Sequence, residues 1–271
     1  MLTRRLALSA AFLLGSGGVW LLSRPLRGEA IDIDVMAATL GERQGVKIGF
    51  GDPTGFFVPP YLAADAPVQG VAFQPVERDA VADSLKGIAK AFDAYPEKCL
   101  GRIIKAIFIA GKITIDGAEA GGTYGLDWVF LAAPKNVSPE TRALTAELGV
   151  HHETSSFLWI RNPKLQRDFT ALAPAGWRFQ DTAADEISRN GNSAPAPETG
   201  FLSAYGATTA ENDFNTYAEI LFSDPDRMKK LAEATPLVAK KLALVAAAYV
   251  AADARLDEQF RKSGLSKIGM R

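Results

Sequence analysis

Histidine and cysteine are scarce in this chain. Its 271 residues include only two histidines, His151 and His152, and one cysteine, Cys99. A single thiol excludes an internal disulfide and any cysteine-rich zinc site. Because no histidine lies near Cys99 in the sequence, this thiol is not expected to act as an activated nucleophile. The stability of the chain must therefore come from its core.

A large excess of charge of one sign is also lacking. The formal net charge is −1, and no run of basic residues is interleaved with aromatic ones. The chain therefore has no global positive field for nucleic acid, and no nucleic-acid partner is expected. Hydrophobic residues make up 48% of the chain and charged residues 23%, which is ordinary for a globular protein with a substantial core.

The N-terminal segment has the pattern of a targeting sequence. Arg4 and Arg5 precede an apolar run over residues 6–22. Such a run after a positive flank is typical of a secretory signal or an uncleaved anchor. We therefore expect residues 1–30 to be a signal peptide or membrane anchor. The protein is then exported, and is either periplasmic or anchored to the inner membrane through residues 6–22.

The remaining pattern predicts an α+β fold, with a small mixed sheet followed by a helical half in a single domain over residues 31–271. Glycines and prolines predict extended, loop-rich structure over 31–75, and a serine cap followed by proline predicts a helix start at 138. The expected helices cover 79–94, 138–160 and 210–222, followed by one from 224 and a long one from 236 through Phe260. The expected strands cover 105–110, 112–115 and 127–133, with a glycine turn near 117–122 and a surface loop at 180–200.

The segment 151–156, His-His-Glu-Thr-Ser-Ser, carries the strongest chemical signal. In the zinc-peptidase motif His-Glu-x-x-His, two imidazoles lie one helical turn apart and the glutamate polarises a metal-bound water. His152 and Glu153 match the first two positions, but Ser156 stands where the second imidazole belongs. Either the metal site is built differently or it is lost.

A second polar cluster lies on the helix predicted over 210–222. One face carries Asn212, Asn215, Thr216 and Glu219, and another carries Asp213, Thr216 and Tyr217. In zinc sites, a carboxylate from a following helix can supply the third ligand. The alternative is a solvated helix face with an acidic first turn.

The order of these segments resembles the zinc-binding metallopeptidases of bacterial envelopes, relatives of the gluzincin-type zinc peptidases. The resemblance covers roughly residues 75–260. The segments that carry it are Tyr95-Pro96, Gly121-Gly122, the His-His-Glu of 151–153, the Gly-Phe-Leu-Ser-Ala-Tyr of 200–205 and Asn212-Asp213-Phe214. It implies a zincin-like architecture.

The resemblance also implies roles for individual residues. His152 is a zinc ligand and Glu153 the general base, with a third ligand from Asp213 or Glu219 and a further contribution from His151. Phenols stabilise oxyanions in such sites, which makes Tyr205 and Tyr217 candidates; the alternative is that both are core tyrosines. The chain departs from the family at Ser156, and also at Asn212 and Thr216, where family members often carry glutamate.

Three functions are compatible with these features. The first is an exported, zinc-dependent metallopeptidase-like hydrolase that acts on peptide or protein. The second is a non-catalytic protein of the same fold that binds an envelope peptide or protein partner. The third is a metal-free binder of small molecules or cell-wall fragments. An extended peptide can pair along the edge of the strand predicted over 127–133; the alternative is that this is an ordinary sheet strand.

Overall fold

A computed structural model describes residues 32–52, 71–125, 127–179 and 197–265. All of them belong to one unit of the chain, 31–271. The segment expected to direct export and most of the loop expected at 180–200 lie outside the described residues. Within the described ranges, no helix is both long enough and apolar enough to cross a membrane.

The main sheet contains three parallel strands and one antiparallel edge strand. Its order is β1 (Lys47–Phe50), β3 (Ala106–Ala110), β7 (Trp128–Ala132) and β6 (Gly122–Tyr124). β1, β3 and β7 run parallel, whereas β6 pairs with β7 in the antiparallel sense. Every residue of β3 and β7 is buried, as expected for central strands covered on both faces.

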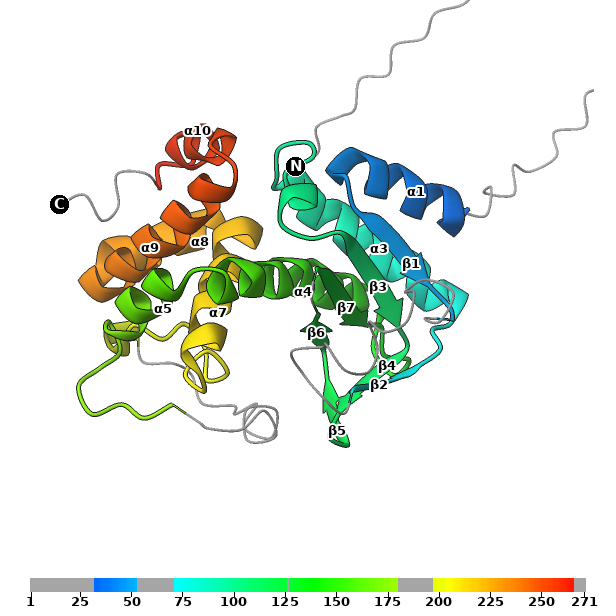
Figure 1. Cartoon of the computed structure of the whole chain (residues 1–271), viewed down its shortest axis with the longest axis horizontal. Helices are drawn as coiled ribbons and strands as arrows, with labels where there is room; N and C mark the ends of the chain where they lie inside the picture. The colour runs from blue at the N-terminus through cyan, green and yellow to red at the C-terminus, as the bar shows by residue number, and fades with distance from the viewer. Residues whose placement is uncertain (1–31, 53–70, 126, 180–196, 266–271) are drawn as a thin grey trace, which may run out of the picture. The chain divides into compact units, whose positions relative to one another are not determined.

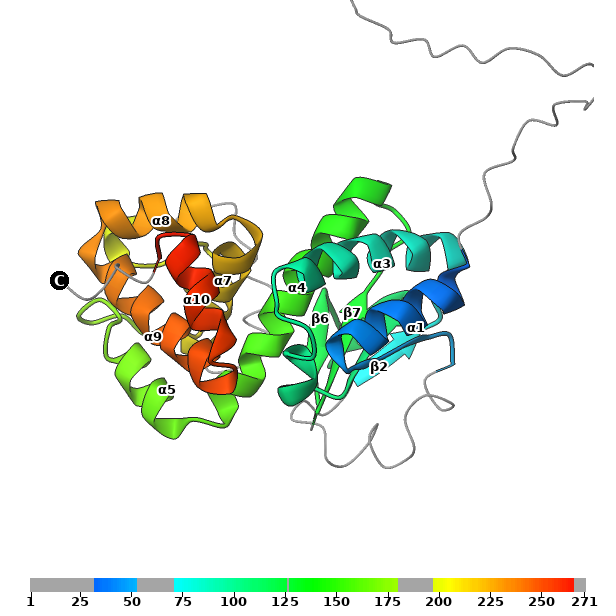
Figure 2. The same cartoon turned by 90° about the horizontal axis from the view of Figure 1, so that it is seen from above.

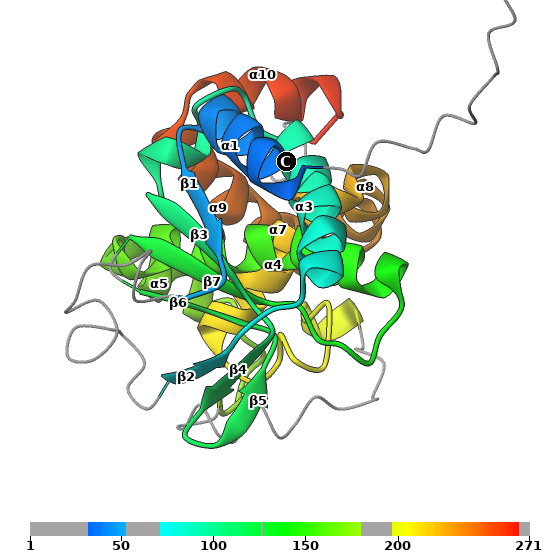
Figure 3. The ribbon, with the colours of Figure 1, turned by 90° about the vertical axis from the view of Figure 1, so that its right-hand side faces the viewer.

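The two faces of this sheet contribute to different hydrophobic clusters. Side chains such as Ile107 and Leu131 join the helices in the main core. Phe108 and Phe130 point to the opposite face and pack with a small sheet of β2 (Val71–Gln74), β4 (Lys112–Ile115) and β5 (Ala118–Ala120). The ring centroids of Phe73 and Phe130 lie 4.0 Å apart. Figure 3 shows the small sheet grouped away from helices α1 and α3.

From α4 onward, the described helices all follow the strands in the sequence. The described helices are α1 (Ile33–Gln44), α3 (Arg78–Asp93), α4 (Pro139–Ile160), α5 (Pro163–Thr170), α7 (Ala210–Ser223), α8 (Pro225–Ala234), α9 (Pro236–Ala252) and α10 (Arg255–Lys262), with short 3-10 turns η1 (Leu100–Arg102) and η2 (Pro197–Thr199). α4 contacts β6 and β7 at one end and α5, α7 and α9 at the other. It therefore links the sheet to the helical half, as Figures 1 and 2 show.

The predicted mixed α+β class is confirmed, and so are several helix starts. Ser138 caps α4 by accepting a hydrogen bond from Thr141 N at 3.1 Å, and Thr209 caps α7 by accepting one from Asn212 N at 3.0 Å. Hydroxyl side chains at these positions satisfy backbone donors that the first turn of a helix leaves unpaired. The sequence thus predicts correctly where the two helices of the polar segments begin.

The extended structure predicted over residues 31–75 is wrong for its first third. α1 begins after Asp32, whose carboxylate accepts from Asp34 N at 3.1 Å, and ends at Gly45, which adopts a positive φ of 70°. Both are ordinary helix boundary signals. The glycine turn predicted near 117–122 is only partly a turn, because this range contains the strand β5 and the first residue of β6.

The long helix predicted from residue 236 through Phe260 is two helices. α9 ends at Ala252, and Asp253 takes an extended conformation before α10 begins. The Asp253 carboxylate accepts a hydrogen bond from Arg255 N at 3.1 Å and pairs with the Arg255 guanidinium at 2.6 Å. These local bonds compete with helix continuation.

Candidate functional site

The polar segments of α4 and α7 meet at a cavity beside the edge strand β6. The cavity has a volume of about 500 Å³. Its walls come from β5, β6, α4, α7 and the segment 205–209 that precedes α7, with Ile115 at the end of β4. The side chains used below are His152, Glu153, Ser156, Tyr124, Tyr205, Glu211, Asn215 and Glu219, all of which line it. A concave site with convergent polar groups is the default position for ligand binding.

His152 is held in place by Glu219. Its Nδ1 lies 2.6 Å from Glu219 Oε1, joining α4 to α7. Burial alone lowers the pKa of His152, but the hydrogen bond and charge of Glu219, with further help from the neighbouring carboxylates, raise it to about 9. At neutral pH the ring of His152 is therefore protonated.

Glu153 lies against the strand β6. A Cβ placed on Gly122 would come within 2.5 Å of Glu153 Oε1, so only glycine at this position allows the carboxylate to approach the strand so closely. Burial raises the pKa of Glu153 to about 7; the His152 charge opposes the rise, and Glu211 adds to it. A carboxyl group with that pKa can take up or release a proton near neutral pH.

Ser156 and Asn215 bond to each other. Asn215 Nδ2 donates to Ser156 Oγ at 2.8 Å, and Asn215 Oδ1 accepts from Ser155 Oγ. Ser155 also donates to the carbonyl of His152 at 2.7 Å. These bonds satisfy polar groups on a helix segment that is buried on nearly every face. They also occupy the position one helical turn after His152.

Sequence reasoning did not identify two of the residues that line the cavity, Tyr124 and Glu211. Tyr124 Oη, from β6, donates to Glu211 Oε1 at 2.8 Å. The helical spacing of Glu211, Asn215 and Glu219, four residues apart each time, places all three on one face of α7, and this spacing was the signal available. Tyr124 gave no such signal, because the strand that carries it lies in a glycine-rich stretch.

The structure places the other residues implied by the resemblance in two different environments. Tyr205 lines the cavity, with its ring centroid 5.7 Å from that of His152. His151 points away, into the core, where its Nδ1 lies 2.9 Å from Tyr95 Oη. Adjacent residues on a helix point about 100° apart, so the two histidines cannot share one ligand site.

Asp213 and Tyr217 also lie away from the cavity. The Asp213 carboxylate pairs with Lys241 Nζ at 2.6 Å, and both side chains are almost completely buried. Lys241 Nζ and Tyr217 Oη donate to the carbonyl of Gly200 at 3.1 and 2.9 Å. Burial raises the pKa of Asp213 to about 7 and lowers that of Lys241, while each partner's charge opposes the change. These groups tie α7 and α9 to the chain that leads to Tyr205.

Zinc does not fit the cavity-lining residues as they stand. His152 is the only imidazole on the described wall of the cavity. At the position of the second imidazole, Ser156 is bonded to Asn215, and serine is a poor ligand for zinc. Over the residues that the structure describes, no group of three or more potential ligand side chains is suitably placed to hold a metal ion.

β6 is an edge strand whose residues also line the cavity. Gly121 O accepts from Ala132 N, and Gly125 N donates to Trp128 O, both at 2.9 Å. Because alternate residues of an antiparallel strand bond the same neighbour, the N–H and C=O of Gly122 point away from β7. No described strand pairs with β6 on that side. The strand predicted over 127–133 is not an edge, since β7 lies between β3 and β6; the edge strand beside the site is β6.

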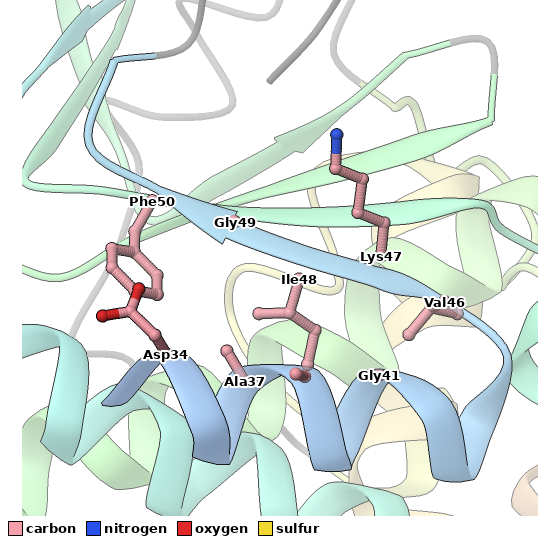
Figure 4. Close-up of a pocket in the computed structure, with 9 residues that line it drawn as sticks. Asp34, Ala37, Gly41, Val46, Lys47, Ile48, Gly49 and Phe50 are labelled. Carbon is pink, nitrogen blue, oxygen red and sulfur yellow. The ribbon is translucent and has the colours of Figure 1, made fainter. Parts of the chain in front are cut away.

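A second hollow, of about 330 Å³, lies between α1 and β1. Its wall is mainly aliphatic and includes Ile48, which points toward α1 in Figure 4, whereas Lys47 points away from it. Asp34 Oδ2 lies 3.4 Å from Arg78. Because its polar groups do not converge, this hollow is not a candidate site.

Comparison with known proteins finds no match: no family model, no curated protein and no solved structure matches the chain. The geometry of the cavity is therefore the basis on which its function is inferred.

The buried His151 is expected to make folding stability depend on pH. Burial lowers its pKa to about 3, so between pH 6.5 and pH 3 the unfolded state binds a proton that the folded state does not. The contribution of His151 to the unfolding free energy should therefore fall as the pH falls, by about 2 kcal/mol between pH 7 and pH 5. Glu153 and Asp213, whose pKa values are raised to about 7, contribute with the opposite sign over this range. The His151 contribution is therefore measured as a difference: urea unfolding at several pH values compares the unsubstituted protein with His151→Asn, which keeps an acceptor for Tyr95, and the stability of the unsubstituted protein relative to the variant should fall by about 2 kcal/mol.

His152 serves as an internal control with the opposite sign. Its raised pKa means that its stabilising contribution is fully present below pH 6.5 and is lost as the pH rises toward 9. His152→Asn should therefore cost more stability at pH 6 than at pH 9. A His151→Asn protein with the same pH slope as the unsubstituted protein would contradict the assignment of His151.

Proposed function

We propose that the protein binds an extended peptide or protein segment in the cavity beside β6 and does not hydrolyse it. The observation that carries the proposal is the meeting of an edge strand with a polar cavity. Gly122 directs backbone hydrogen-bonding groups along a wall that also presents His152 and Glu153. Addition of a strand to an exposed sheet edge is a recurrent mode of peptide recognition, in which backbone bonds give affinity and pockets give specificity.

The proposal includes a zincin-like, metallopeptidase-derived architecture and an exported location. The architecture is supported by a helix that carries His152-Glu153 alongside an antiparallel edge strand, with Glu219 from a later helix on His152. Export is supported by the arginines and apolar run of the first 30 residues. On this view the partner is a peptide or protein of the cell envelope, and residues 6–22 either are removed or anchor the protein to the inner membrane.

A zinc-dependent hydrolase is the second candidate. It is favoured by Glu153, a buried carboxyl group in the cavity with a pKa of about 7, as a general base requires. It is opposed by Ser156 and Asn215, which bond to each other on the cavity wall. Elemental analysis of protein purified without chelators separates the two: stoichiometric zinc together with peptide cleavage, detected by mass spectrometry, would establish the hydrolase.

Gly122→Ala is expected to weaken peptide binding about tenfold, which is about 1.4 kcal/mol. The added Cβ would lie 2.5 Å from Glu153 Oε1 and 3.1 Å from Phe130 O of the neighbouring strand β7, so it pushes the carboxylate away from the strand and disturbs the position of β6. Fluorescence anisotropy with labelled ten-residue peptides rich in threonine and valine, varied at the central residue, measures the dissociation constants.

Gly121→Ala is the matched control. A Cβ at Gly121 meets no atom within 4 Å, so this variant should bind the same peptides as the unsubstituted protein does. Thermal unfolding of both variants checks that the fold is retained. Equal dissociation constants for Gly122→Ala and Gly121→Ala would count against binding along β6.

A further inference from the structure

The cavity has an unbalanced charge. Four glutamates, Glu119, Glu153, Glu211 and Glu219, line it together with His152, and its described wall contains no lysine or arginine. Glu219 is neutralised by His152 at 2.6 Å, and Glu119 by Lys112 at 2.9 Å. Glu153 and Glu211 have no cationic side chain paired with them among the described residues. The cavity therefore presents two carboxyl groups without a salt-bridge partner in the described part of the chain, and for Glu153 the nearby charge of His152 only partly offsets burial.

Glu153 is the more informative of the two. Its side chain is buried, with an exposed fraction of 8%, and no described group donates a hydrogen bond to its carboxylate. Gly122 forms the wall beside Oε1 and brings no side chain. A buried carboxylate without a donor is costly, and the side from which a donor can approach is the cavity.

Glu211 lines the same cavity from α7. It is held by Tyr124 Oη at 2.8 Å, which leaves its charge in place, because a phenol donates a hydrogen bond without neutralising a carboxylate. The charge of Glu211 raises the pKa of Glu153, so each carboxylate lies within reach of the other's field. Tyr205 adds an aromatic ring to this wall, a surface that favours the stem and head of a basic side chain.

We propose that the segment bound along β6 carries a lysine or arginine whose cationic group enters the cavity between Glu153 and Glu211. This inference rests on the proposed function and names the chemistry of the partner. A cation on a flexible stem supplies the donor that Glu153 lacks and balances the charge of both carboxylates. A bare metal ion fits less well, since no described set of three or more ligand groups is placed to hold one.

Four labelled ten-residue peptides test the proposal in the purified full chain. They are identical except for a central lysine, arginine, norleucine or glutamate. At low ionic strength, the lysine or arginine peptide is expected to bind about tenfold more tightly than the norleucine peptide, and the glutamate peptide is expected to bind most weakly. The lysine and arginine arms show which basic side chain the cavity prefers. Norleucine matches the length of lysine without its charge.

Glu153→Gln and Glu211→Gln keep the shape of the wall and remove one charge each. Either substitution should reduce the preference for the basic peptide over norleucine from about tenfold to about threefold or less. Glu77→Gln is the control, because Glu77 is exposed, pairs with Lys135 and does not line the cavity. It should leave the preference unchanged. Thermal unfolding confirms that the variants are folded.

The outcomes separate this inference from the proposed function. If the basic and norleucine peptides bind equally, or if the preference persists in both glutamine variants, the basic partner is refuted while peptide binding stands. If none of the four peptides binds, peptide binding along β6 fails and the inference fails with it. A tenfold preference that both variants weaken and Glu77→Gln leaves intact supports the inference.

Discussion

Ser156→His combined with Asn215→Glu is expected to bind zinc far more tightly than the unsubstituted protein does. His152 and residue 156 lie one helical turn apart on α4, and the present hydrogen bond of 2.8 Å between Ser156 and Asn215 shows that α7 brings residue 215 to the same place. His152 Nδ1 is already bonded to Glu219, the outer-shell partner that orients a ligating imidazole. The double variant would thus supply two imidazoles and one carboxylate.

The expected effect on zinc affinity is large. Structural zinc sites of four ligands bind with about 10–16 kcal/mol, so each ligand contributes about 3 kcal/mol, or roughly a hundredfold in affinity. Adding two ligands should therefore tighten zinc binding by about ten-thousandfold. Competition with a chromogenic chelator measures the affinity, and elemental analysis gives the stoichiometry.

His152→Ala in the double-variant background is the control for the site's location. It should abolish most of the gain, because it removes one of the three designed ligands. Each single variant, Ser156→His or Asn215→Glu, should gain much less than the pair. A double variant that folds and still binds no zinc would show that α4 and α7 do not present these positions to a common point.

Lys241→Met is expected to lower the unfolding free energy by about 3–5 kcal/mol. Lys241 and Asp213 form an ion pair at 2.6 Å with side chains that are 0% and 1% exposed. Methionine fills much of the same volume but leaves the carboxylate buried without its cation. Asp213 Oδ1 already has no hydrogen-bond partner, so nothing in place can compensate. Urea unfolding followed by circular dichroism measures the loss.

Lys240→Met is the matched control for this substitution. Lys240 is the preceding residue on α9 and is exposed, so its replacement should change stability by less than about 0.5 kcal/mol. Adding Asp213→Leu to Lys241→Met should recover most of the loss, because an apolar pair replaces the uncompensated charge. A loss below about 1 kcal/mol for Lys241→Met would mean that solvent reaches Asp213.

Local signals predicted the helices of the site better than its strands. Ser138 and Thr209 each cap a helix by bonding a backbone N–H only three residues later, so the signal is local in the sequence. The structure places α4 and α7 directly after these two residues. β6 has three residues and begins with glycine, so neither alternation nor β-branched content marks it in the sequence. Gly122 is required there by contact with Glu153, which is distant in the sequence.

The same distinction applies to the single residues of the site. The sequence by itself determined that His152 and Glu153 lie on a helix and that Ser156 follows them at one turn. Only the tertiary structure decided that His152 faces the cavity while His151 faces Tyr95, and that Glu219 reaches His152 while Asp213 turns to Lys241. Helical periodicity defines which residues share a face, but the direction of that face is set by packing against segments 28 to 67 residues away.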